Sequence, residues 1–202
     1  MKSSNKILIL GSIGLDTIET QYGKKESLLG GSATYATIAA GINGKAIPLG
    51  IVGDDFPLEG YEVFSKYSLN INNIEEQSGA TFRWGGKYHD DGDGRDTLFT
   101  ELGVFENFQP VIKQSDSNVS WLFLANIHPA LQMSVLEQCT NDPVVIIDTM
   151  NLWIDTTPNE LMLLLNKTNI LLINESEIFE LTRSADVEAA VNKVLSMGPE
   201  KI

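Results

Sequence analysis

Two adjacent glycines, Gly30 and Gly31, stand directly before a run of small residues that predicts a helix over 32–42. Because glycine has no side chain and tolerates positive φ, backbone amides at such a point can approach a ligand closely. Amides at a helix N-terminus favour polar or anionic groups, so Gly30, Gly31 and Ser32 are candidate binding residues. The same glycine pair could instead serve tight packing of the chain.

Polar side chains recur directly after the short apolar runs of the chain. They are Asp16, Asn126, His128, Asp148, Asn151, Asn174 and Glu177, together with Gly53-Asp54-Asp55. In open α/β sheets, ligands bind beyond the carboxyl ends of the strands, which meet at one edge. We therefore expect a binding site at this edge, with Asn126 and His128 among its substrate contacts. His128 could instead form hydrogen bonds within its own loop.

The elements that must position these residues alternate between strand and helix. The apolar runs that predict strands are 7–10, 46–52, 121–125, 144–147 and 170–173. Helical patterns cover 32–42, 58–67, 130–140, 158–166, 175–181 and 186–197. Thr157, Pro158 and Glu160 form a start signal for the fourth of these helices. The alternation predicts an α/β fold with a doubly wound, mostly parallel sheet.

The segment 74–105 departs from this alternation. Its β-type stretches at 81–84 and 97–100 flank a polar loop at 90–96, which predicts a hairpin. We expect the hairpin to pair with short strands within 16–29 in a small side sheet or lid. The loop is expected to be a solvated tip, because a calcium loop would place His89 and Thr100 at positions that need carboxylates.

Composition narrows the classes of function. The 202 residues carry 14 basic and 27 acidic side chains, a net charge of −13, which argues against nonspecific binding of nucleic acid or of anionic membranes. No segment approaches membrane-spanning length, and the start shows no signal-peptide pattern. The single Cys139 cannot form an internal disulfide. We therefore expect a cytoplasmic protein.

Four motifs together resemble the ribokinase-like (PfkB) family of carbohydrate and nucleoside kinases. They are Gly11-Ser12-Ile13-Gly14-Leu15-Asp16, Gly30-Gly31-Ser32-Ala33, Gly50-Ile51-Val52-Gly53-Asp54-Asp55-Phe56 and Asn174-Glu175-Ser176-Glu177. They keep the family's order and spacing over nearly the whole chain. The resemblance implies that 1–202 is the N-terminal portion of a single ribokinase-like α/β domain, with lid inserts at about 16–29 and 80–102.

The resemblance also implies roles for individual residues. Asp16 is similar to the carboxylate that accepts hydrogen bonds from sugar hydroxyls, and Gly30 and Gly31 to the pair that presents backbone amides to the substrate. Asn174 and Glu177 match the Asn-x-x-Glu motif that helps organise Mg²⁺ and phosphate, with Glu177 toward the metal. The cofactors would be ATP and Mg²⁺. The lid could also mediate a homodimer.

The activity implied is that of a carbohydrate kinase, an ATP-dependent phosphotransferase that acts on a hydroxyl of a sugar, nucleoside or related polyol. The family's Gly-x-Gly-Asp motif, which carries the catalytic base, does not occur up to Ile202. We therefore expect the catalytic base and much of the ATP-binding segment to lie beyond this residue, and 1–202 alone to be inactive. We also expect an incomplete sheet, with helix 186–197 partly uncovered where a further strand should begin. Tyr35 stands where family members commonly carry asparagine.

Two other functions stay open from the sequence. A non-catalytic sugar-binding or regulatory module would keep the substrate-holding residues without the catalytic base. A Rossmann-type oxidoreductase is less favoured, because Gly11-Ser12-Ile13-Gly14 lacks the three-glycine dinucleotide fingerprint.

Local structural alternatives also remain. Asp16 could cap a turn, and Asn174 with Glu177 has the spacing of a helix capping box. Arg83 and Arg95 are scarce cations in an acidic chain. Each could reach phosphate or sugar from the lid, or lie on the surface.

Overall fold

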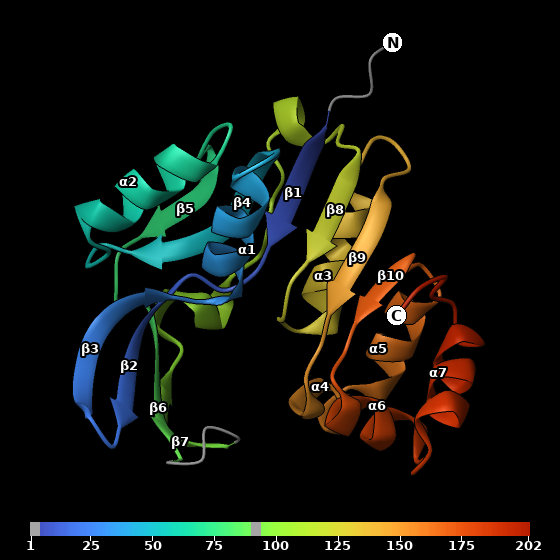
Figure 1. Cartoon of the computed structure of the whole chain (residues 1–202). Coiled ribbons are helices and arrows are strands. Elements are labelled where there is room, and N and C mark those ends of the chain that lie inside the picture. The colour runs from blue at the N-terminus through green and yellow to red at the C-terminus, as the bar shows by residue number, and fades with distance from the viewer. Residues whose placement is uncertain (1–4, 90–93) are drawn as a thin grey trace. The chain divides into compact units, whose positions relative to one another are not determined.

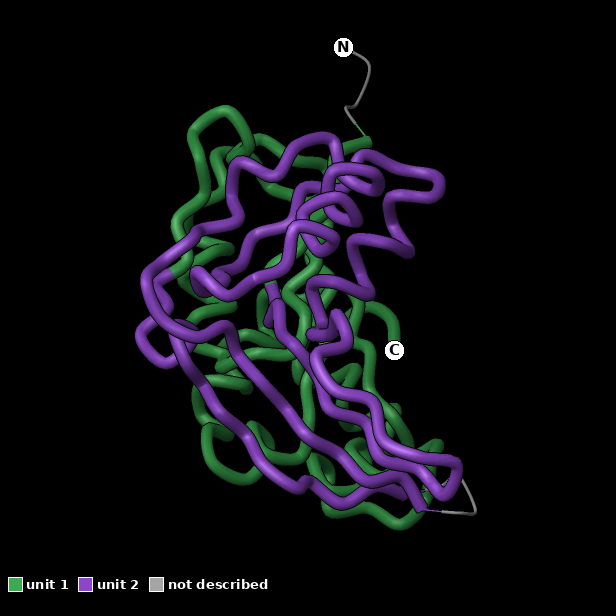
Figure 2. The backbone as a smooth tube through the Cα atoms, turned by 90° about the vertical axis from the view of Figure 1, so that its left-hand side faces the viewer, with its two compact units in different colours: residues 1–10, 110–202 green, residues 11–109 purple. Residues whose placement is uncertain are grey.

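The computed structural model describes residues 5–89 and 94–202, and the chain divides into two compact units (Figures 1 and 2). The first unit contains Met1–Leu10 and Pro110–Ile202, and the second contains Gly11–Gln109. Residues 90–93, which belong to the predicted hairpin tip, lie outside the described residues.

The first unit has four parallel strands in the order β10-β9-β8-β1. The strands are β1 (Lys6–Leu10), β8 (Trp121–Leu124), β9 (Val144–Asp148) and β10 (Ile170–Leu172). Leu8 pairs with Leu122, which in turn pairs with Val145, so apolar side chains meet across the sheet. Parallel strands are buried on both faces, which explains why these segments are continuous apolar runs.

Six helices lie among the described residues of the same unit. They are the 3₁₀-helix η2 (Gln114–Asp116) and the α-helices α3 (Pro129–Glu137), α4 (Asn151–Thr156), α5 (Pro158–Leu165), α6 (Glu175–Thr182) and α7 (Val187–Leu195). Val194 of α7 is buried, but Val187 is 48% and Leu195 38% exposed, so the helix is partly uncovered as expected. Beyond α7, Lys201 forms a parallel bridge with Ile170 of β10, where the sequence predicts a further strand to begin.

The second unit contains a parallel strand pair, β4 (Lys45–Gly53) and β5 (Asn73–Gln77), with the helices α1 (Ser32–Gly41) and α2 (Leu58–Tyr67). Every residue of β4 after Lys45 is buried. A side chain on Gly41 would overlap the backbone of Tyr67, so α1 and α2 can approach closely only with glycine there.

The side sheet of the second unit contains β2 (Gly14–Thr20), β3 (Gly23–Gly30), β6 (Phe82–Tyr88) and β7 (Arg95–Glu101) in the order β3-β2-β6-β7. β2 and β6 run parallel, whereas the two outer pairs are antiparallel. The predicted pairing of the hairpin with the strands at 16–29 is therefore confirmed. The 3₁₀-helix η1 (Gly103–Asn107) follows β7.

Helix α4 and strand β5 were not predicted. Helix α5 begins at Pro158 as predicted, but Thr157 does not cap it with its side chain. Its hydroxyl donates instead to the carbonyl of Trp153 at 3.1 Å, and no side chain caps α5. The reason is that α4 ends at this residue, so Thr157 completes the preceding helix.

Candidate functional site

The Asp16 carboxylate lies directly against Gly30. Asp16 is part of β2 and pairs with Leu28 of β3, so it does not cap a turn. A side chain on Gly30 would overlap the carboxylate of Asp16, so only glycine leaves the space that this carboxylate occupies. The register of the β2–β3 hairpin thus brings two of the predicted binding residues together.

The Asp16 carboxylate has no hydrogen-bonding or charged partner among the described residues of the chain. The residue is half-buried, and burial raises the pKa of its carboxyl group. A partly desolvated carboxylate without donors is costly, and hydrogen bonds from a bound molecule would stabilise its charged form. The position therefore suits a ligand that presents hydroxyl groups.

The backbone around Gly31 is fixed by a reciprocal pair of serines. Gly31 has φ 92°, and a side chain there would overlap the Ser12 carbonyl group. The Ser12 amide donates to Ser32 Oγ at 3.2 Å, and the Ser32 amide donates to Ser12 Oγ at 3.1 Å. The Ala33 amide donates to the Ser12 carbonyl at 3.0 Å. Two amides of the first turn of α1 are thus used within the protein, which limits the donors that this helix end offers a ligand.

Tyr35 lies in the first turn of α1 and is 62% exposed. Partial burial raises the pKa of its phenol, and the charges of Asp16 and Tyr88 raise it further. The phenol therefore belongs to the surroundings of the Asp16 carboxylate.

A second group of candidate residues follows the strands of the first unit. Asn174 and Glu177 form a capping box: the Glu177 amide donates to Asn174 Oδ1 at 2.9 Å, and the Asn174 amide donates to Glu177 Oε2 at 3.1 Å. The local cap predicted from their spacing is therefore confirmed. Because the cap uses Oε2, the other carboxylate oxygen of Glu177 remains for a further role.

Asp148 is a carboxylate that interacts electrostatically with Glu177. It ends β9, and it accepts hydrogen bonds from the backbone amides of Thr149 and Asn126. Burial and then the charge of Glu177 raise the pKa of Asp148 to about 6. The hydroxyl of Thr149 is buried and has no hydrogen-bond partner among the described residues. The repulsion between the carboxylates of Asp148 and Glu177 is one that a bound cation would relieve.

Asp148 and Glu177 fit a Mg²⁺ ion that is also bound by phosphate oxygens. Mg²⁺ takes oxygen ligands and is usually held by one or two carboxylates, with water and phosphate oxygens completing its shell. Asp148 and Glu177 would supply the carboxylates. Within the described ranges, no group of three or more His, Cys, Asp or Glu could hold a metal by itself. A Mg²⁺ ion here would therefore depend on oxygens from a bound phosphate.

Asn126 and His128 are largely committed to the protein's own structure. Asn126 accepts a hydrogen bond from Trp153 Nε1 at 2.8 Å and donates to Met150 Sδ at 3.1 Å. His128 Nδ1 accepts from the Ala130 amide and caps α3, and its ring packs edge-on against Trp153. The geometry favours the alternative that His128 forms hydrogen bonds within its own loop, and Asn126 supports the same loop.

Gln132 is a residue of this edge that the sequence analysis missed. Its side chain is 1% exposed, and Nε2 lies within hydrogen-bond distance of the carbonyls of Leu124, Ala125 and Asp148, at 2.9, 3.1 and 3.1 Å. This amide joins the ends of β8 and β9, and so it fixes the backbone that carries Asp148. A polar residue inside a predicted helix gives no sign of such partners.

The two arginines of the side sheet also have partners in the second unit. Arg83 forms an ion pair with Asp55 at 2.6 Å, and the Arg95 guanidinium lies 5.4 Å from the centre of the Trp84 ring. Both interactions favour structural roles over direct contact with a ligand.

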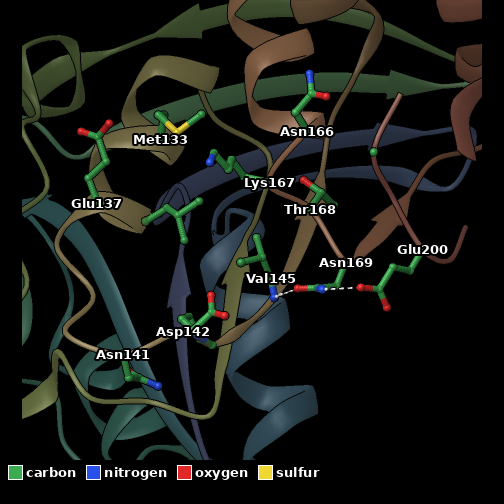
Figure 3. A pocket seen from close by; sticks show the side chains of 13 residues that line it. Met133, Glu137, Asn141, Asp142, Val145, Asn166, Lys167, Thr168, Asn169 and Glu200 are labelled. Atoms are coloured by element: carbon green, nitrogen blue, oxygen red, sulfur yellow. Dashed lines mark hydrogen bonds between the residues drawn. The ribbon is translucent and has the colours of Figure 1, made fainter. Parts of the chain in front are cut away.

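The first unit also has a cavity of about 510 Å³ (Figure 3). Its lining includes Val145, so it lies toward the start of β9 and not toward the end that carries Asp148. In it, Asn169 accepts from the Val145 amide at 2.8 Å and donates to Glu200 at 3.0 Å. Val145 stands at the start of β9, whereas Asp148 ends the same strand. The cavity therefore contains none of the candidate residues.

Comparison with known proteins identifies the fold. No protein-family model matches the chain, and a search of curated proteins found no match. Several solved structures match. Adenosine kinase from Sinorhizobium meliloti superposes with a TM-score of 0.76 at 15% identity, over 97% of this chain and 73% of that one.

Two further structures agree. Arabidopsis thaliana ribokinase, solved with ribose and ATP, gives a TM-score of 0.72 at 18% identity and covers 97% of this chain and 70% of its own. The Methanocaldococcus jannaschii nucleoside kinase, an archaeal member of the ribokinase family, gives 0.71 at 18% identity, over 94% and 68%. The architecture is thus that of an α/β protein with a side sheet. More specifically, this chain has the ribokinase-like fold, which confirms the predicted fold class.

The described part of the chain has no helix with both the length and the apolar character needed to cross a bilayer.

Proposed function

We propose that this protein is part of an ATP-dependent phosphotransferase that acts on a hydroxyl group of a sugar, nucleoside or related polyol in the cytoplasm. The observation that carries the proposal is the half-buried Asp16 carboxylate, which lies against Gly30 and has no donor among the described residues. The ribokinase-like fold supports it, because the similar solved structures include a ribokinase and nucleoside kinases.

Asp16 would hold the substrate by accepting hydrogen bonds from its hydroxyl groups. A hydroxyl is a donor that a carboxylate can accept, and hydrogen bonds to a charged acceptor are stronger than those between neutral groups. Gly30 keeps the space beside the carboxylate free of a side chain. The exposed ring of Tyr35, close to the same carboxylate, would add an apolar surface for the substrate.

Asp148 and Glu177 would hold Mg²⁺ together with the phosphates of ATP. Mg²⁺, when bound, neutralises charge that develops on the transferred phosphoryl group. Gln132 and the capping box keep the two carboxylates in place. The predicted catalytic base, an Asp in a Gly-x-Gly-Asp segment, would lie beyond Ile202, so we expect 1–202 alone to bind substrate without phosphorylating it.

The test is a thermal-shift and calorimetric screen with ribose, fructose and adenosine, using wild type, Asp16→Asn and the control Glu19→Gln, which changes a partly exposed carboxylate on the same strand. A ligand at 100 times its Kd adds about 2.7 kcal/mol, and we expect the melting temperature to rise by about 5–10 °C for a chain of this size. Asp16→Asn should weaken binding at least about tenfold, because a charge-assisted hydrogen bond is lost. If none of the three compounds binds, or if Asp16→Asn binds as well as Glu19→Gln, the proposal fails.

A non-catalytic sugar-binding module remains the second candidate, because the sequence up to Ile202 lacks the Gly-x-Gly-Asp segment. The two candidates predict the same binding and differ in turnover. Phosphate transfer from ATP by a longer form that carries a Gly-x-Gly-Asp segment would support the kinase, and binding without transfer would support the module.

We also propose that the side sheet serves as the lid and as a homodimer contact. Its outer strands β3 and β7 are exposed along most of their length, including Leu28 and Leu98. Exposed strand edges and apolar side chains are typical sites of pairing between copies. Light scattering after size exclusion should show a dimer, and Leu98→Lys should shift it toward monomer; a wild-type monomer at high concentration would contradict this.

A further inference from the structure

The turn Gly53-Asp54-Asp55, which follows β4, holds the first residues of β6. Asp55 Oδ1 accepts a hydrogen bond from the Thr81 amide at 2.7 Å, and Asp55 Oδ2 forms an ion pair with Arg83 at 2.6 Å. Burial raises the pKa of Asp55, but the hydrogen bonds from Thr81 and Arg83 outweigh it and hold the pKa below its ordinary value. One carboxylate thus joins the β4–α2 turn to the side sheet.

The two preceding residues bind the same short segment. The Gly53 amide donates to the buried hydroxyl of Thr81 at 3.0 Å, and the Asp54 amide donates to the carbonyl of Gly79 at 3.1 Å. A side chain on Gly53 would overlap the backbone of Gly79 and Thr81. The segment 79–83 is therefore held by a single turn at Gly79, Thr81 and Arg83.

Glycines flank this attachment at both ends of the β6–β7 hairpin. Gly79 has φ 134° and precedes β6, and Gly103 has φ 53° and follows β7. The Val104 amide donates to the Ala80 carbonyl at 2.9 Å, so both ends of the hairpin meet at this point. A change in the direction of the hairpin would require rotation here, and such rotation would break the contacts of Asp55.

The position of β6 matters because β6 is the parallel partner of β2. In this register, Arg83 is opposite Leu15, and Trp84 is opposite Asp16. We infer that Asp55 is a positioning residue that, through Thr81 and Arg83, fixes β6 and with it the strand that carries Asp16. Asp55 acts without touching the substrate. The consequence for substrate binding rests on the proposed function, whereas the attachment itself does not.

Hydrogen exchange measured by mass spectrometry tests the attachment without any ligand. The variants are Asp55→Asn, which keeps the shape but loses the charge, and Arg83→Gln, which leaves the Thr81 hydrogen bond intact. The control is Glu19→Gln, which breaks the ion pair of Glu19 with Lys87 at 2.7 Å within the same sheet. All three changes are on partly exposed side chains, so each variant should fold, which the melting temperature will check.

We expect amide exchange in 79–84 to be about fivefold faster in Asp55→Asn, faster by a smaller factor in Arg83→Gln, and unchanged in Glu19→Gln. If exchange in Asp55→Asn matches that in Glu19→Gln, the inference is overturned, whatever the protein binds. The second readout is the affinity for whichever of ribose, fructose or adenosine the wild type binds. Weaker binding by Asp55→Asn and Arg83→Gln, but not by Glu19→Gln, supports positioning of Asp16, and equal binding despite faster exchange overturns it. If the wild type binds none of the three, the proposed function fails and exchange alone decides on the attachment.

Discussion

Replacing Gly30 with alanine should reduce both the stability of the protein and its affinity for the substrate. The new methyl group would overlap the Asp16 carboxylate, which is the mobile end of a side chain and can rotate away. Gly30 has no positive φ, so alanine meets no backbone strain there. Overpacking of this kind costs about 1–2 kcal/mol when the neighbour can move. We expect that loss in the free energy of unfolding, with a loss of affinity for the polyol substrate of about tenfold or more because the carboxylate is displaced.

A double-mutant cycle tests the cause. In an Asp16→Ala background the methyl group has no carboxylate to meet, and Gly→Ala at a compatible position stabilises a protein by about 0.4–1 kcal/mol through the unfolded state. Urea denaturation of wild type, the two single variants and the double variant gives the coupling energy, which should be at least about 1 kcal/mol. Calorimetry gives the affinities. If Gly30→Ala destabilises the protein equally in both backgrounds, the carboxylate is not what the methyl group meets, and the reasoning about this site is wrong.

Three further predictions concern the first unit. The pKa of Asp148 is raised from 3.8 to about 6, so between these pH values the folded state keeps a proton that the unfolded state releases. The contribution of Asp148 to the free energy of unfolding therefore falls as the pH rises from about 4 to 6. Urea denaturation at about pH 4 and at pH 7 should show that Asp148→Asn is more stable than wild type at pH 7, by about 1–2 kcal/mol after allowance for solvent access. Millimolar Mg²⁺ with ATP should raise the melting temperature of wild type but of neither Asp148→Asn nor Glu177→Gln, and an equal rise in all three would contradict the metal assignment. Asn174→Ala should cost about 1 kcal/mol as the loss of a helix cap, whereas Thr157→Ala should cost less, because the Thr157 side chain does not cap the N-terminus of α5.

Local patterns in the sequence were sufficient where the interaction is local. The capping box of Asn174 and Glu177 needs only a spacing of three residues, and the structure has it as predicted. The pattern at Thr157 and Pro158 correctly predicts where α5 begins, but the Thr157 side chain does not cap it, because its hydroxyl donates to the Trp153 carbonyl of α4. A local rule cannot show which of two adjacent helices uses a residue.

Contacts between residues far apart in the sequence could not be predicted from the sequence alone. Gln132 bonds to carbonyls of two strands, and nothing in a helical pattern indicates them. Strand β5 was missed because the segment Asn73–Gln77 is largely polar, and β5 pairs with β4 alone. Asp55 could be singled out as a polar residue after a strand, but its partners Thr81 and Arg83 lie 26 and 28 residues further along.

The buried amide of Gln132 restricts how this protein could be altered by engineering. Its single NH₂ group carries only two hydrogens, yet three carbonyl oxygens lie within reach, so the bonds must be shared. Leucine would leave those carbonyls unsatisfied, and glutamate would bring a negative charge toward them. Libraries that aim to change the substrate should therefore leave residue 132 alone and vary Tyr35, which is 62% exposed and interacts with Asp16.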